Sequence, residues 1–199
     1  MLRIHPKIAN KVPSDVKGKT LERMYPARLH ISAEKAVAAD TDGIHAAVDG
    51  AAQELTTSIT NPAVPRNVTA TAGGTAGSIK AVQVIVEGTD YNGKAITETL
   101  PAFTVDTAGT VQGSKAFKTI TKITIPAHDA TSATTEIGWG EKLGLPYRLP
   151  FNTVQAAYLN NAKEGTAPTV VTSATDLAAN TVDLNSALNG SDVDVLLLV

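Results

Sequence analysis

Apolar and polar residues alternate along much of the chain after residue 67, which is the pattern of strands with one buried face. Residues 80–87 place Val82, Val84 and Val86 on one side. Residues 117–125 form the longest alternating run and predict one continuous strand. Its faces comprise Phe117, Thr119, Thr121, Ile123 and Ile125 on one side, and Lys118, Ile120, Lys122 and Thr124 on the other. Further strands are predicted at 68–71, 95–100, 134–138, 154–160, 169–172, 180–184 and 193–199.

Turn residues separate these runs. Residues 90–93 (DYNG) predict a β-hairpin, because Asn92-Gly93 readily adopts the two positive φ angles of a type I′ turn. Short strands about 8–12 residues apart, with turn residues between them, are typical of a sandwich or barrel. We therefore predict a β-sandwich or barrel domain over residues 60–199.

The first 59 residues show a different pattern. Prolines at 6, 13 and 26 interrupt residues 1–32, where no apolar period persists, so we predict an extended arm. Residues 33–59 are rich in Ala and predict a short helical segment, with Asp42 capping a second short helix at 43–49. Residues 60–67 contain two prolines and predict the hinge between the arm and the domain. The expected fold class is mainly β.

Composition narrows the range of functions. The chain has 30 Ala and 26 Thr but only 3 Phe, 4 Tyr and 1 Trp, which suits close sheet packing better than a deep aromatic ligand pocket. It has no Cys, which excludes disulfides and thiolate chemistry. The start lacks the apolar segment of a signal peptide, and no apolar run approaches the about 20 residues of a membrane span. We expect a protein made in the cytoplasm that does not act at a membrane.

Charge is distributed unevenly. Residues 1–35 hold eight of the 17 basic residues and three acids, so this part carries +5 and the remainder −7. The arm is expected to dock on an acidic surface of nucleic acid, a partner or a sister subunit; the alternative is a solvated basic tail. The candidate partner contacts in the arm are Arg3, Lys7, Lys11, Lys17, Lys19, Arg23 and Arg28. Trp139, between two glycines, is a further candidate contact, or it fills the core at a strand corner.

No catalytic, metal or cofactor motif emerges. The four His have neither HxxxH nor HExxH spacing, and the adjacent pair His128-Asp129 rarely forms a dyad. Residues 40–43 (DTDG) resemble the start of a calcium loop, but the later ligand positions do not fit. Tyr25 is the only aromatic residue of the arm, so a base-stacking platform is lacking. We expect a protein that is not an enzyme, has no cofactor and does not bind a specific nucleic acid.

Several segments resemble structural proteins of tailed bacteriophages. They are residues 61–69 (NPAVPRNVT), 82–100, 113–123, 137–146 and 181–190. The resemblance covers about residues 35–199 and leaves the arm uncovered.

The resemblance implies a virion component. We expect a capsid decoration (cement) protein on the capsid surface, which contacts the major capsid protein and copies of itself, with a trimer as the guessed oligomer. The first alternative is a tail tube or head–tail neck protein. The second is a carbohydrate-binding β-sandwich module, for which the candidate exposed aromatics are Trp139, Tyr91, Tyr147 and Tyr158.

Overall fold

The computed structural model describes residues 11–13, 20–22 and 24–199. Antiparallel strands build this part of the chain, as the alternating pattern predicts, and the mainly β fold class is confirmed. The helical turns described are two 3₁₀ turns, η1 (Ala76–Ser78) and η2 (Leu177–Ala179).

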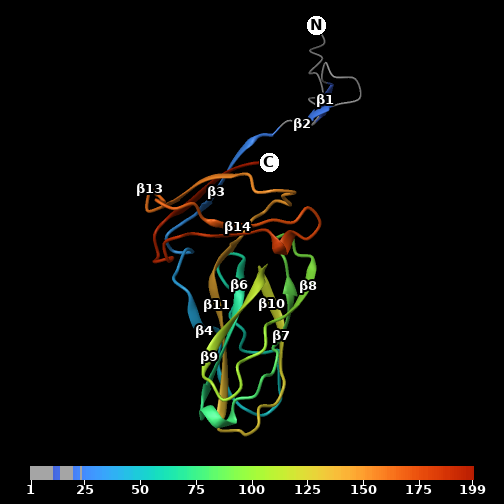
Figure 1. Cartoon of the computed structure of the whole chain (residues 1–199), viewed down its shortest axis with the longest axis vertical. Coiled ribbons are helices and arrows are strands. Elements are labelled where there is room, and N and C mark those ends of the chain that lie inside the picture. Colours follow the sequence, from blue (N-terminus) through green and yellow to red (C-terminus); the bar gives the residue numbers. More distant parts are fainter. Residues whose placement is uncertain (1–10, 14–19, 23) are drawn as a thin grey trace.

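The strands form three larger sheets and one hairpin (Figure 1). The first sheet has the order β5 (Gln53–Leu55), β10 (Thr119–Ile125), β7 (Ile85–Thr89), β8 (Ala95–Thr99). The second has the order β14 (Thr169–Val171), β15 (Thr181–Asp183), β11 (Ala133–Gly144), β6 (Arg66–Gly74), β9 (Gly109–Phe117), with β4 (Asp40–Asp49) also paired to β11. The third has the order β13 (Ala162–Lys163), β12 (Val154–Leu159), β16 (Val193–Leu198), β3 (Pro26–Ile31). Strands β1 (Lys11–Pro13) and β2 (Thr20–Glu22) pair with each other.

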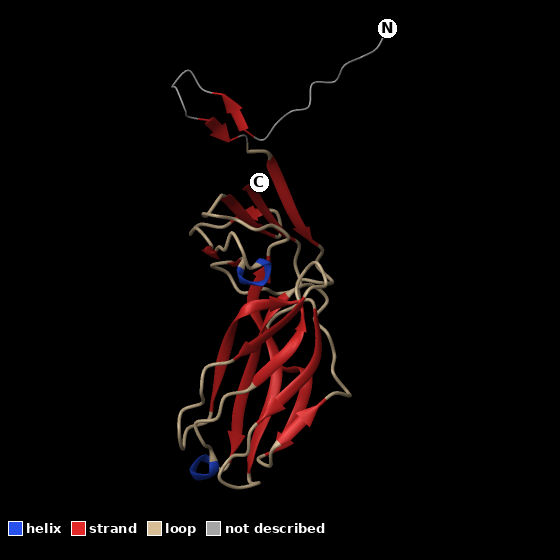
Figure 2. Ribbon diagram, turned by 90° about the vertical axis from the view of Figure 1, so that its right-hand side faces the viewer, coloured by secondary structure: helices blue, strands red, loops and turns tan. Residues whose placement is uncertain are grey.

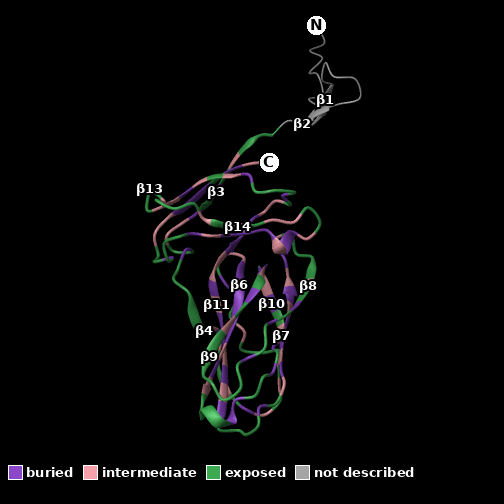
Figure 3. Ribbon diagram, in the orientation of Figure 1, coloured by how far each residue is buried: buried purple, intermediate pink, exposed green. Residues whose placement is uncertain are grey.

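Two hydrophobic cores lie end to end along the molecule, and buried residues line the inside of each layer (Figure 3). The first core fills the sandwich between the first and second sheets and includes Val84, Phe117 and Ile137. The second core lies under the third sheet and includes Leu143 and Val195. The predicted domain 60–199 therefore contributes to two cores, which also include residues before it such as Leu29 and Ile44, and strand β11 contributes to both.

The predicted strand 117–125 is two strands in different sheets. Phe117 ends β9 in the second sheet, and Thr119 begins β10 in the first. The register of β10 against β7 then shifts between Ile120 and Lys122, which marks a β-bulge. Ile120 is therefore buried, and Thr121 is exposed, contrary to the predicted alternation.

The predicted helical segment at 33–59 is wrong. Residues 40–49 form β4, which pairs with β11, and residues 53–55 form β5. Ile44 on β4 is 1% exposed and belongs to the first core, while Asp42 caps no helix. Pairing with β11 and burial of Ile44 outweigh the helix propensity of the alanines, which is a weak preference.

The predicted arm 1–32 wrongly includes residues 26–31, which belong to the folded body. Residues 26–31 form β3, whose backbone pairs with β16 and whose Leu29 and Ile31 are buried in the second core. Pro26 does not interrupt the strand because it begins an edge strand, where the missing N–H is tolerated. Only residues before 24 remain as a candidate arm.

The hairpin predicted at 90–93 is confirmed, but its turn type differs. Gly93 N–H donates to the Asp90 carbonyl at 3.0 Å, and in this turn only Gly93 has a positive φ, of 82°. Asp90 Oδ1 accepts the N–H groups of Asn92 and Lys94, both at 2.9 Å. This is a type I turn followed by a glycine bulge, held by a buried carboxylate.

The close contact of β4 with β11 gives a test of the corrected fold. A methyl group on Gly138 would meet the backbone of Asp40 on β4. We expect Gly138→Ala to lower the free energy of unfolding by about 2 kcal/mol, measured by urea denaturation. Gly109→Ala, whose methyl group meets nothing within 4 Å, is the matched control and should change it little. Equal stabilities would contradict the packing of β4 on β11.

Candidate functional site

Most of the candidate contacts in the arm fall outside the described residues. These are Arg3, Lys7, Lys17, Lys19 and Arg23. Lys11 lies on β1, where its backbone pairs with Glu22 on β2. Hairpin β1–β2 lies beyond the third sheet, on the same side as the C-terminus (Figure 2). The structure thus leaves the docking role of these residues as a prediction.

Arg28 belongs to the folded body. Its Nε and Nη2 donate to the two carboxylate oxygens of Asp194 on β16, at 2.6 and 2.8 Å. His30 Nδ1 lies 2.9 Å from the same carboxylate. The hydrogen bond from Arg28 is the main cause that lowers the pKa of Asp194. This bidentate pair fastens β3 to β16 on the outer face of the third sheet.

Trp139 is half-buried and packs against the first core. Its ring covers Gly43 on β4 so closely that a methyl group there would lie 2.7 Å from a ring carbon. Its Nε1 donates to the carbonyl of Ala38 at 3.1 Å. These contacts favour the core interpretation of Trp139, since its polar atom is already engaged within the chain.

Buried polar side chains replace backbone hydrogen bonds where the ladders break. The register of β11 against β6 shifts between Trp139 and Leu143. Asn67 Oδ1 accepts the N–H of Lys142 at 3.0 Å in this gap. Arg66 Nε donates to Gly140 O and its Nη1 to Val37 O, both at 2.7 Å. Burial lowers the pKa of Arg66 to about 10, so the guanidinium stays charged at neutral pH.

Two further asparagines act in the same way. Asn61 Oδ1 accepts the N–H of Ile120 at 2.6 Å, next to the bulge of β10. Asn180, fully buried, accepts N–H groups from Leu149 and Ser173 and donates back to the Ser173 carbonyl at 2.9 Å. Satisfying buried backbone groups in this way avoids a cost of about 1–3 kcal/mol each.

Glu98 joins the edges of the first two sheets. It lies on β8, and its Oε1 accepts the backbone N–H of Ser114 on β9 at 2.7 Å and the Ser114 hydroxyl at 2.8 Å. The N–H of Lys115 lies 3.2 Å from both carboxylate oxygens. This buried carboxylate therefore closes one side of the sandwich.

His128 connects loops at the end of the sandwich remote from the third sheet. Its Nδ1 accepts the N–H of Lys80 at 3.1 Å, so its Nε2 carries the proton and donates to Thr135 Oγ1 at 2.9 Å. Burial lowers the pKa of His128, and the nearby carboxylate of Asp129 opposes this effect weakly. Both ring nitrogens of His128 thus have partners other than Asp129, whose carboxylate lies 3.7 Å from Lys80 Nζ.

The acidic residues at 40–43 form no metal centre in the described residues, where no group of three or more His, Asp or Glu could hold an ion. Asp40 and Asp42 lie close together on β4, and the hydrogen bond between them, with the charge of Asp40, raises the pKa of Asp42.

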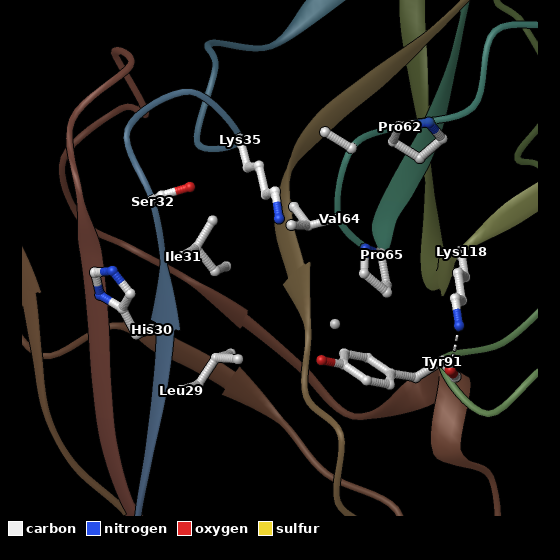
Figure 4. Close-up of a pocket in the computed structure, with 12 residues that line it drawn as sticks. Leu29, His30, Ile31, Ser32, Lys35, Pro62, Val64, Pro65, Tyr91 and Lys118 are labelled. Carbon is white, nitrogen blue, oxygen red and sulfur yellow. Dashed lines mark hydrogen bonds between the residues drawn. The ribbon is translucent and has the colours of Figure 1, made fainter.

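A cleft of about 380 Å³ lies where the two cores meet (Figure 4). Residues 29–32 of β3 and the turn after it form one wall, and residues 62–65 form the opposite wall. Tyr91 and Lys118 approach from the side of the first core, and Lys118 Nζ donates to the Tyr91 carbonyl at 3.4 Å. The segment predicted to be a hinge, 60–67, is thus a wall of the cleft, and its last two residues are buried in β6.

Sequence reasoning missed this cleft because it assigned β3 to the arm. The signal is the alternation of Arg28 and His30 with Leu29 and Ile31, which the helix- and strand-interrupting character of Pro26 outweighs in the sequence pattern. The position of residues 62–65 opposite β3 depends on long-range packing, which no local pattern reveals.

A comparison of the chain with protein-family models, curated proteins and solved structures gives no match. Within the part of the chain that the structure describes, no helix has the length and apolar character needed to span a bilayer.

The junction at Glu98 gives a second prediction. Glu98→Ala leaves buried backbone N–H groups of β9 without an acceptor, so we expect the free energy of unfolding to fall by about 2–4 kcal/mol in urea denaturation. Glu87→Ala on neighbouring β7 is the control, because its pair with Lys122 is solvent-exposed and should contribute less than about 1 kcal/mol. Equal losses in the two variants would contradict the role of Glu98.

The geometry of His128 gives a third prediction. A lowered folded-state pKa means that stability is fully present above the ordinary pKa of about 6.5 and is lost as pH falls towards the folded value. We expect the melting temperature to fall from pH 7 to pH 5 less in His128→Asn than in the original chain. Asparagine can still accept the Lys80 N–H but does not titrate in this range. The other three histidines are common to both proteins, so identical pH slopes would disprove the assignment.

Proposed function

We propose that the chain is a structural protein of a tailed-phage virion that decorates and stabilises the capsid through multivalent subunit contacts. The observation that carries the proposal is the hairpin β1–β2, whose strands pair with no other described strand and which lies beyond the end of the body (Figures 1 and 2). The major capsid protein and sister copies are its proposed partners, and the capsid surface is its proposed location.

The hairpin needs a partner surface for energetic reasons. Each strand has three residues, and an isolated two-stranded hairpin is marginally stable at best in water. The first 25 residues carry six basic and two acidic side chains. A basic segment attached to a folded body is suited to an acidic surface on another subunit.

The folded body, residues 26–199, is built for a structural role. Two cores share strand β11, and buried Arg66, Asn67 and Asn180 are engaged with backbone groups around them. Glu98 adds a fastening between sheets. Apart from Arg66 Nη2, which is buried without a partner, the polar atoms of these side chains have structural partners, which supports a function based on buried area rather than on a reaction.

The resemblance to tailed-phage structural proteins lies in the scaffold. Of its segments, 61–69 contains Asn61, Arg66 and Asn67, the three side chains that bridge the ladder breaks in the first core and at its junction with the second. Segment 82–100 contains the hairpin held by Asp90 and the fastening residue Glu98. Residues that fix bulges and sheet edges are constraints of fold, so the segments that carry the resemblance serve the scaffold and not a reaction site.

Multivalency explains how such a segment could hold a shell together. Fully extended, 23 residues span at most roughly 80 Å, and the pairing of residues 11–13 with 20–22 shortens this reach. Ordering it costs conformational entropy at each residue. Repeated copies on a symmetric shell offset this cost, because each bound copy raises the effective concentration of neighbouring contacts.

The position of β3 determines which N-terminal deletion tests the proposal. Removal of residues 1–23 keeps β3, so we expect the truncated chain to keep its melting temperature but to lose co-sedimentation with expanded phage capsids by tenfold or more. Removal of residues 1–32 is the contrasting variant, and it should also lower stability because it deletes β3 from the third sheet.

Two outcomes would overturn the proposal. One is saturation of capsids by the 1–23 deletion with unchanged affinity. The other is assembly of the purified chain into rings or tubes without capsids, seen by negative-stain microscopy, which would favour the tail tube or neck class.

A further inference from the structure

Strand β3 presents a free edge. It pairs with β16 on one side and with no described strand on the other. Tyr25 and Val199, next to the paired strands, exchange both backbone hydrogen bonds, at 2.7 and 2.9 Å. In an antiparallel pair such mutual bonds recur at every second residue, so Arg28 and His30 direct their backbone groups away from β16. Pro26 also falls at an outward position, where it has no N–H to lose.

The cleft described above runs along this edge. Four consecutive residues, 29–32, line it, although neighbouring side chains of a strand point to opposite faces. In Figure 4 the side chains of Leu29 and Ile31 point toward Val64 and Tyr91, whereas that of His30 points away, so the cleft borders the apolar side of β3 next to its free edge. Residues 62–65 stand opposite with two prolines, so that wall offers few N–H groups to β3 itself.

The rim of the cleft is cationic. Lys35 and Lys118 line it from opposite walls, and none of the described residues that line it is Asp or Glu. Both lysines are exposed, and Lys35 extends over the cleft between Ile31 and Val64 in Figure 4. Apolar side chains of Val64 and Pro65 and the ring of Tyr91 lie below this rim.

We infer that this cleft binds an extended acidic peptide segment of a partner protein, which adds as a strand to the free edge of β3. The outward backbone groups of Arg28 and His30 supply the main-chain hydrogen bonds. Lys35 and Lys118 pair with carboxylates of the segment, and its intervening apolar side chains contact Val64 and Tyr91. The charges argue against the chain's own N-terminal segment as occupant, because that segment is basic.

The inference does not depend on the virion proposal. The 1–23 deletion retains β3, residues 62–65 and both lysines, so it should bind acidic peptides whether or not it still binds capsids. Loss of capsid binding and loss of peptide binding are therefore separate results.

A peptide-binding assay tests the inference. The probes are two fluorescein-labelled seven-residue peptides of the same Val and Thr positions, one with Glu and one with Lys at the three remaining positions. We expect fluorescence anisotropy with the full-length chain to show at least tenfold tighter binding of the Glu peptide. The double variant Lys35→Glu/Lys118→Glu changes only exposed side chains and should reverse this preference.

Strand addition is tested separately from charge. His30→Pro removes one outward N–H, whereas His30→Ala removes the same imidazole and keeps the N–H. We expect the Ala variant to bind the Glu peptide as the original chain does and the Pro variant to lose at least tenfold, with melting temperatures recorded for both. Equal binding of the two peptides, no binding at 1 mM, or equal affinities of the charge-reversed and original chains would overturn the inference.

Discussion

Strand β11 supplies the backbone pairing on which both cores depend. One of its edges pairs with β6 over most of its length, while the other pairs first with β4 and then, at Leu143 and Gly144, with β15. The same strand thus leaves the first core and enters the second without a linker. The ladder is interrupted once on the way, and Asn67 and Arg66 supply the hydrogen bonds that the interruption removes. The two cores are joined by backbone continuity, and the cleft beside β3 lies where they meet, with residues 62–65 as one of its walls.

Small side chains make this arrangement possible, and buried polar ones keep it in register. Gly138 and Gly140 on β11 allow the Asp40 backbone and the Asn67 side chain to approach where a methyl group would collide. A sheet with so few large residues gains less from burial per residue, so a register slip would be less costly than in an aromatic core. Amide and guanidinium groups that fit only one register restore that specificity, because a displaced strand would leave them buried without partners. The many Ala and Thr residues thus allow close packing, and the buried Asn side chains fix the register of the strands.

The local sequence pattern predicted many strands of the first core, but not β4, the division of residues 117–125 between two sheets or the cleft. Alternation located most strands after residue 67, and the turn residues at 90–93 located a hairpin, because both depend on neighbours in sequence. The sequence predicts a helix at 43–49 because alanine propensity is a local signal, whereas the partner strand β11 of this segment lies about 90 residues away. The division of 117–125 between two sheets depends on Asn61, a distant side chain that binds the bulge. Of the candidate contacts, Arg28 and Trp139 proved to be engaged within the fold, and the cleft could not be foreseen without β3.

The pairing of β3 with β16 also determines how the body bears load. The N-terminal segment leaves the body at Tyr25, beside the end of the chain at Val199, while β16 enters the third sheet from the opposite end at Val193. A pull on that segment along β3 therefore acts on opposite ends of the two strands, in shear. Their hydrogen bonds lie perpendicular to such a pull, so the six paired positions resist together and cannot open one at a time. The bidentate contact of Arg28 with Asp194 adds a side-chain cross-link to the same seam. Tension on the N-terminal segment would thus meet the strongest direction of the sheet.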